Sequence, residues 1–234
     1  MKRFYSTVRV RPVDDGFSIL LDERPMRTPA KHPFSLPTVA LADAIAEEWE
    51  VQPAKIDPST MPLTRHAYTA IDGVRTHASQ VADEIARFGE TDLLCYRADA
   101  PEALARQQAE AWQPLLDWLY ETYGVGLVST SGVVPTTQDP GGIGVLRRLV
   151  GGYNAFELAA LHTVVSISGS LVIGFAVATG RLDAENAWRL SRVDHDFQAD
   201  RWGVDHEAAA LAAKTEGDLA AAVRFLALAR SSQS

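Results

Sequence analysis

Cysteine is almost absent from this chain. Cys95 is the only one among 234 residues, which rules out an internal disulfide and a cysteine-rich metal site. A reducing compartment suits such a composition best. Cys95 lies in the apolar run of residues 93–96, a setting typical of a small buried residue rather than of a reactive thiolate. The cysteine content therefore gives no indication of thiol chemistry.

Positive charge is also scarce. Lys and Arg total 22 against 30 Asp and Glu, which gives a net charge of −8. An acidic chain is a poor match for nucleic acid or for an anionic membrane surface. The start, MKRFYSTVRVRP, has no apolar stretch of the kind that a signal peptide needs. The alternation of valine and arginine over residues 8–11 instead predicts a strand of the fold.

A glycine-rich phosphate loop is missing as well. The glycines within residues 141–144 follow a proline rather than a strand, and no βαβ pattern surrounds them. A loop that opens a helix is the better interpretation. Gly169 and Gly174 are spaced like phosphate-loop glycines, but Phe-Ala at 175–176 replaces the required Lys-Ser/Thr. We expect no cofactor.

The six histidines are scattered, with no pair at i, i+4. The best candidate for chemistry is the run Asp194, His195, Asp196, followed by Asp200. In a helix, Asp196 and Asp200 would share one face while His195 points elsewhere, so we expect no metal site. A small soluble enzyme with an acid–base or metal site over residues 194–207 remains the alternative function.

What the chain does have is a proline-punctuated segment over residues 20–72. Each proline fixes φ and removes an N–H donor, so the pattern predicts rigid extended pieces and turns around one helix. The seven prolines are Pro25, Pro29, Pro33, Pro37, Pro53, Pro58 and Pro62.

The first 75 residues predict a β-meander with a helix. Strands are expected at about 4–13, 17–21 and 25–28, with an Asp-Asp-Gly turn between the first two. A helix is expected over 39–50, capped by Thr38, with apolar residues at i, i+4 and i+8 on one face.

After residue 75 the apolar residues follow a helical period. Pro114 should kink or divide the helix that ends at Gly124. Further helices are expected at about 141–151, 154–166, 169–179, 183–201 and 206–231, the last broken near Gly217. Residues 158–180 carry no charged side chain. Their polar centre favours two short buried helices over a membrane span.

The fold class is therefore α+β. A small N-terminal β-meander/α domain (residues 1–75) should precede a larger all-helical domain (residues 76–234). Stable membrane insertion is not expected.

Two tryptophans flanked by carboxylates are candidate partner contacts. Glu48 and Trp49 fit either a solvated acidic face with a core tryptophan or an exposed contact patch. Around Trp202, Gly203 fits a helix end, Asp205 the next N-cap, and Glu207 the first turn, where a carboxylate complements the helix dipole. The second group also fits a partner contact.

Several segments in order resemble the ATP synthase assembly factor two family. They read LDERPMRTPAK, LADAIAEEWEVQ, TMPLTRHAYTAID, TDLLCYRADAPEAL, QQAEAWQPLLDW, SGSLVIGFAVATGRLDAENAW and DFQADRWGVDHEA, and together they cover nearly the whole chain. Glu23 departs from the family pattern, because a turn glycine is usual there.

The resemblance implies a chaperone and not an enzyme. Its expected partner is the free α subunit of the ATP synthase catalytic head, whose subunit interface it would shield until the α/β hexamer forms. It implies a cytoplasmic protein in bacteria and a mitochondrial-matrix protein in eukaryotic relatives. The family's functional carboxylate falls on Glu207.

Overall fold

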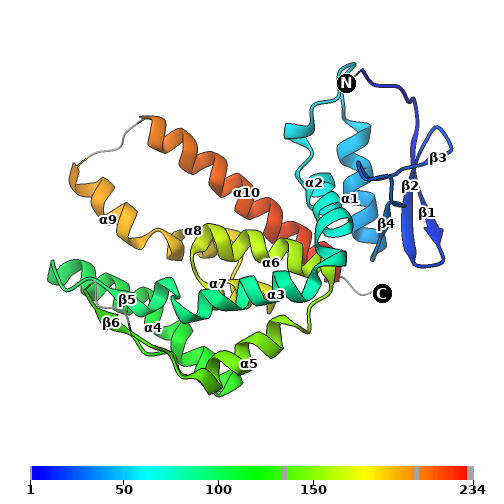
Figure 1. Cartoon of the computed structure of the whole chain (residues 1–234). Coiled ribbons are helices and arrows are strands. Elements are labelled where there is room, and N and C mark those ends of the chain that lie inside the picture. Colours follow the sequence, from blue (N-terminus) through cyan, green and yellow to red (C-terminus); the bar gives the residue numbers. More distant parts are fainter. Residues whose placement is uncertain (1, 133–135, 203–205, 231–234) are drawn as a thin grey trace. The chain divides into compact units, whose positions relative to one another are not determined.

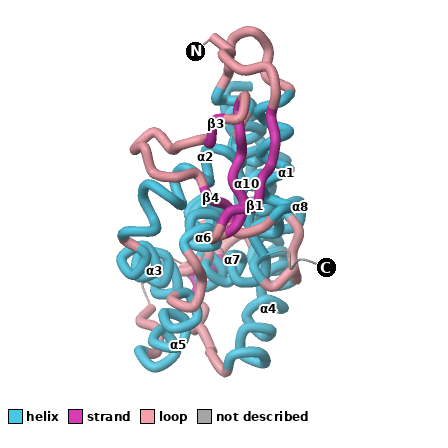
Figure 2. Tube along the Cα trace, turned by 90° about the vertical axis from the view of Figure 1, so that its right-hand side faces the viewer, coloured by secondary structure: helices cyan, strands magenta, loops and turns pink. Residues whose placement is uncertain are grey.

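The computed structural model describes residues 2–132, 136–202 and 206–230 (Figure 1). A four-stranded antiparallel sheet occupies the N-terminal part, and helices make up most of the rest, as the tube in Figure 2 shows. This confirms the α+β class. The later part is not entirely helical, because the short strands β5 (Tyr96–Arg97) and β6 (Thr130–Ser131) pair in parallel.

The backbone contacts divide the chain into two compact units. Within the described residues, the first unit contains 2–78, 154–160 and 221–230, and the second contains 79–132, 136–153, 161–202 and 206–220. The helices α6 (Ala155–Ser168) and α10 (His206–Arg230) each contribute residues to both units. The contiguous domains 1–75 and 76–234 stay a prediction.

The sheet of the first unit follows the predicted meander. Strands β1 (Val8–Val13) and β2 (Gly16–Leu21) form a hairpin, and β2 also pairs with β3 (Arg24–Pro25) and β4 (Ser35–Leu36). Strand β4 was not anticipated, because a two-residue strand leaves no readable alternation. Gly16 has φ +127°, and a Cβ there would lie 2.2 Å from the Leu36 carbonyl oxygen, so the turn requires glycine.

The β2–β3 turn places two residues other than glycine in the left-handed region, Asp22 (φ 49°) and Glu23 (φ 65°). A two-residue hairpin turn of this kind needs positive φ at both central positions. The Oδ1 atom of Asp22 accepts the N–H groups of Ser6 and Thr7, both at 2.9 Å, and these bonds lower the pKa of Asp22. Glu23 only pairs with Arg9 at the surface.

The first helix, α1 (Val39–Glu50), has the predicted bounds and cap. The Thr38 Oγ1 atom accepts the Leu41 N–H at 3.1 Å and donates to the Leu228 carbonyl of α10 at 2.7 Å. Leu41, Ile45 and Trp49 are buried on the face that the apolar spacing predicted.

The second helix, α2 (Pro62–Tyr68), corrects the expectation of extended pieces and turns. A π-helical turn at Thr69–Gly73 and a 3₁₀ turn at Val74–Thr76 continue it. Pro62 occupies the first helical turn, where its missing N–H has no partner to lose. Pro58 begins a 3₁₀ turn (Pro58–Thr60) in the same way. Two of the prolines therefore start helical turns instead of preventing them.

The helices of the second unit lie largely where the period placed them. They are α3 (Ala78–Arg87), α4 (Glu102–Tyr123), α5 (Pro140–Val150), α7 (Leu171–Ala178), α8 (Ala184–Ser191) and α9 (Val193–Trp202), with parts of α6 and α10. Three details differ: α4 continues through Pro114, the expected helix 183–201 is divided at Arg192, and α10 continues through Gly217. The opening of α5 by the glycines after Pro140 is confirmed.

The charge-free run of residues 158–180 contains most of α6 and the whole of α7. Gly169 separates them at φ +68°, and the Ser170 hydroxyl accepts the Ile173 N–H to start α7, whose eight residues are all buried. Among the described residues, no helix is long and apolar enough to cross a membrane.

A fully buried carboxylate, Asp92, connects this helix to the rest of the unit. Its two oxygens accept the N–H groups of Leu94 (3.1 Å) and Val172 (3.0 Å). Burial raises the pKa of Asp92 to about 6, although these hydrogen bonds and one from Ser170 oppose the rise.

The strained turn leads to a stability prediction. A left-handed backbone costs a side-chain-bearing residue about 1–2 kcal/mol, and the flexible unfolded state of glycine offsets roughly half of that gain. Losing the exposed pair with Arg9 costs little. Glu23→Gly should therefore raise the free energy of unfolding by about 0.5–1 kcal/mol in urea titration. Asp22→Gly, the matched control, should lower it, because the bonds to Ser6 and Thr7 disappear. If Glu23→Gly were less stable than wild type, the backbone at Glu23 would not be strained.

The buried carboxylate leads to a pH prediction. Folding raises the pKa of Asp92 from 3.8 to about 6. Between these two values the native state keeps the Asp92 proton, whereas the unfolded chain has already released it. Asp92 therefore contributes stability at low pH, and this is lost as pH rises from about 4 to about 6, up to roughly 3 kcal/mol. Asp92→Asn cannot titrate, so its stability relative to wild type should rise across that interval. Parallel stability curves for the two proteins would contradict this assignment.

Candidate partner-binding surfaces

Trp49 is a core residue of the first unit. Its side chain is 7% exposed, and its Nε1 donates to Thr64 Oγ1 of α2 at 3.2 Å. The Tyr5 hydroxyl donates to the Trp49 carbonyl at 2.6 Å, with the two rings 5.7 Å apart. Trp49 thus fixes α1 to α2 and to the N-terminal segment, which confirms the core interpretation.

Glu48 caps the neighbouring helix. Its carboxylate accepts the N–H groups of Leu63 (2.7 Å) and Thr64 (2.8 Å) and the Thr64 hydroxyl (2.7 Å). These N–H groups belong to the first turn of α2, which receives no side-chain bond from its own cap residue Met61. Burial raises the pKa of Glu48, against the hydrogen bonds and the charge of Arg224. Its geometry is that of a structural residue, and a partner contact at Glu48 or Trp49 stays a prediction.

A cavity of about 300 Å³ lies beside Trp49. Apolar and aromatic side chains line most of it, together with two guanidinium groups. The lining includes Phe4, Met26, Trp49, Tyr68, Arg24 and Arg27. Phe4 is 62% exposed, and burial raises the pKa of Tyr68 to about 12. Such a lining suits an apolar side chain next to a carboxylate.

The second predicted group falls at the junction of α9 and α10. Trp202 is the last residue of α9, and Asp205 lies outside the described residues, as does Gly203. Glu207 is exposed in the first turn of α10, as the sequence indicated. Its role as a contact stays a prediction.

Helix α10 has two different halves. Residues 207–213 are exposed except for the half-buried Ala212, and Leu211 is 65% exposed. The second half buries Leu219, Ala222, Phe225, Leu226 and Ala229. Phe225 contacts the rings of His66 and Phe156 within the first unit. The first half is therefore an apolar helical surface that the described part of the chain leaves accessible.

The alternative acid–base site has structural explanations. Asp194 accepts a hydrogen bond from Gln108, whose own oxygen accepts the Ala98 N–H at 2.7 Å, and Asp196 pairs with Arg192. His195 is exposed. The described residues contain no group of three or more His, Cys, Asp or Glu that could hold a metal ion. Cys95 is buried, and its thiol pKa is raised to about 12.

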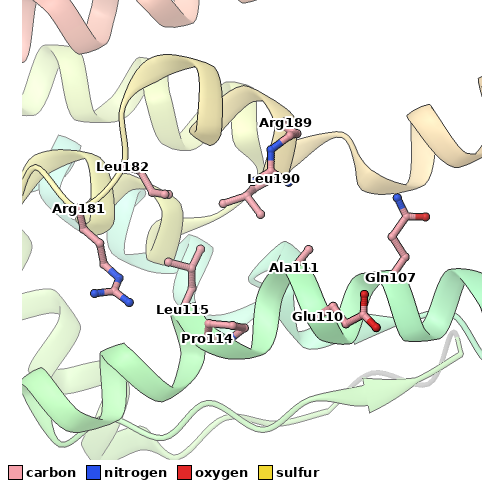
Figure 3. Close-up of a pocket in the computed structure, with 9 residues that line it drawn as sticks. All are labelled: Gln107, Glu110, Ala111, Pro114, Leu115, Arg181, Leu182, Arg189 and Leu190. Atoms are coloured by element: carbon pink, nitrogen blue, oxygen red, sulfur yellow. The ribbon is translucent and has the colours of Figure 1, made fainter.

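A groove between α4 and α8 was missed by the sequence interpretation (Figure 3). It has a volume of about 510 Å³, and its lining comes from both sides: Gln107, Glu110, Ala111, Pro114 and Leu115 from α4, and Arg181, Leu182, Arg189 and Leu190 from α8 and the preceding loop. The one signal in the sequence was Pro114, an unusual proline in a helix interior.

The described residues bring together no group of side chains that could hold a metal ion, and their accessible features are a cavity, a helix surface and a groove. The model for the ATP12 chaperone protein family matches residues 2–120, about half of the chain. The chain belongs to the ATP12 chaperone family, which confirms the resemblance and makes it a chaperone and not an enzyme.

Solved structures of similar proteins support the same family assignment. Atp12 from Paracoccus denitrificans is 49% identical with a TM-score of 0.95, and an aspartate-to-lysine variant of it is 48% identical; each match covers 98% of both chains. The Atu1473 protein of Agrobacterium tumefaciens is 42% identical with a TM-score of 0.92, over 97% of this chain and 85% of that one. The mitochondrial protein atp12 of Schizosaccharomyces pombe is 25% identical over 86% of this chain and 74% of its own length.

The capping role of Glu48 can be tested against its neighbour. Glu48→Ala leaves two partly buried N–H groups of α2 without an acceptor, so unfolding should become easier by about 1–3 kcal/mol. Glu47→Ala removes an exposed carboxylate from the same helix and should change stability by less than about 0.5 kcal/mol. Chemical denaturation of both variants measures the difference. Equal stability of the two variants would remove the capping role.

Proposed function

We propose that this chaperone binds the free α subunit of the ATP synthase catalytic head and covers the surface that the β subunit later occupies. Membership of the ATP12 family supports an assembly role. A free subunit exposes an apolar interface, which is an aggregation hazard until its partner arrives. A chaperone for it needs a complementary apolar surface and no catalysis.

The observation that carries this proposal is the exposed first half of α10. Its residues 208–213 are five alanines and Leu211. Alanine side chains let a partner approach the helix closely, and Leu211 supplies an apolar side chain that is 65% exposed and can enter a groove of the partner. The buried second half of the same helix holds the exposed half in a helical conformation that it would not keep alone.

The small size of this surface suits a temporary complex. One exposed helical segment buries less area than a stable subunit interface, so the β subunit can displace the chaperone from a larger contact. The chaperone should bind the α subunit in the compartment where that subunit folds. We propose the cytoplasm for a bacterial chain, while the fission-yeast relative is mitochondrial.

Glu207 lies at the N-terminal end of this surface. It can act in two ways, through the dipole of its own helix and as a contact with the α subunit. As a first-turn carboxylate it complements the helix dipole, and its reversal to Lys would cost about 0.5–2 kcal/mol of stability. As a contact it meets a positive or amide-rich patch of the client, and reversal would place like charges together at the interface. The proposal assigns both roles to it.

Glu207→Lys should fold and yet bind the purified α subunit at least about tenfold more weakly in titration, since a like-charge contact costs more than 1.4 kcal/mol. Glu216→Lys is the matched control, because it makes the same charge change on the opposite side of α10 at about 100° per residue. It should bind as wild type does. Melting temperatures must be measured alongside. Wild-type affinity of a folded Glu207→Lys would refute the contact.

A further inference from the structure

The groove between α4 and α8 has an apolar floor. Leu115 and Leu190 are 4% and 5% exposed, and the half-buried Leu182 completes it. Figure 3 shows these three side chains converging on the space between the helices, above Pro114. An aliphatic side chain entering there would meet leucine on three sides.

The two ends of the groove carry opposite charge. Glu110 and Gln107 of α4 lie at one end and Arg181 at the other, while Arg189 lies on the α8 side beside Leu190 (Figure 3). The Arg181 guanidinium lies 5.4 Å from the ring centroid of Trp118, which steadies it against the helix. An occupant with a cation near Glu110 and an anion near Arg181 would complement the two ends.

Pro114 adds a backbone acceptor at the acidic end. Proline has no N–H, so the carbonyl of Glu110 lacks its usual i→i+4 donor within α4. Both residues line the groove. The Glu110 carboxylate and its own carbonyl together favour a donor-rich cation such as lysine or arginine.

The openness of the rim favours a protein segment over a small molecule. Gln107, Glu110, Pro114, Arg181 and Arg189 are all exposed. A small ligand is normally buried over most of its surface, which a site with this rim does not provide. A helix of another protein can place one side chain on the floor and extend its charges to both ends.

We propose that this groove is a second docking site for the α subunit, and the inference rests on the function proposed above. The occupant is an amphipathic helical segment with an aliphatic side chain on the Leu115–Leu182–Leu190 floor. A lysine or arginine of that segment meets Glu110, and an aspartate or glutamate meets Arg181.

Charge reversal tests the two ends. Glu110→Lys and Arg181→Glu should each raise the Kd for purified α subunit at least about tenfold. The controls are Glu121→Lys, on the same helix outside the groove, and Arg148→Glu on α5, both at exposed positions. These should bind as wild type does, and all four variants should melt near the wild-type temperature.

Cross-linking tests the occupant. A thiol-directed photocross-linker on Gln107→Cys should capture an α-subunit peptide with an aliphatic residue between opposite charges, whereas Glu121→Cys should not. The buried Cys95, with its raised thiol pKa, leaves the introduced cysteine as the reactive one. If wild type binds the α subunit but the reversals change nothing, or no such peptide is captured, the groove is not a docking site and the chaperone function stands. If wild type does not bind the α subunit, both proposals fall.

Discussion

The fold depends on supplying acceptors to buried N–H groups at the start of helices. A helix leaves its first-turn N–H groups without internal partners, and burying them unpaired is costly. In α2 the acceptor is Glu48, which comes from the preceding helix. In α7 the Ser170 hydroxyl accepts the Ile173 N–H, and Asp92, 80 residues earlier in the chain than Val172, accepts the Val172 N–H. Burial of each carboxyl group raises its pKa, and the hydrogen bonds from the helix N–H groups oppose that rise. These bonds tie α2 to α1 and α7 to the residues around Asp92, in addition to the packing of Trp49 and of the buried α7 side chains.

The sequence predicted elements well where local signals agreed. Helix α1 was predicted closely because Thr38 marks its start and the apolar spacing continues to Trp49, near its end. Helix α2 was missed because the prolines were interpreted as breakers, although Pro62 stands where the lost N–H is harmless. The division at Arg192 has no glycine or proline to announce it. The contribution of residues 154–160 and 221–230 to the first unit depends on tertiary packing, which a period along the chain does not encode.

The same limit applies to the candidate surfaces. Sequence could point to Glu48 and Trp49 as a pair, but it could not say that one accepts N–H groups from α2 while the other donates to Thr64. Glu207 was placed correctly in a first turn because a dipole argument is local. The α4–α8 groove could not be predicted, since its two sides are separated by more than 60 residues and meet only after folding. Local chemistry is readable from a single sequence, and a concave surface made of distant segments is not.

The distribution of reactive groups suits a chaperone. Asp92 and Cys95, whose perturbed pKa values would attract attention in an enzyme, are buried and occupied with structure. What the second unit leaves accessible is apolar helix surface and a groove with opposite charges at its ends. On the proposed function, two small contacts on one unit bind the client together more tightly than either alone, through effective concentration. A partner subunit that displaces one contact removes that advantage from the other. A partner subunit can therefore displace the chaperone from two modest contacts more readily than from one large contact of equal total affinity. A chaperone that covers its client only temporarily requires this.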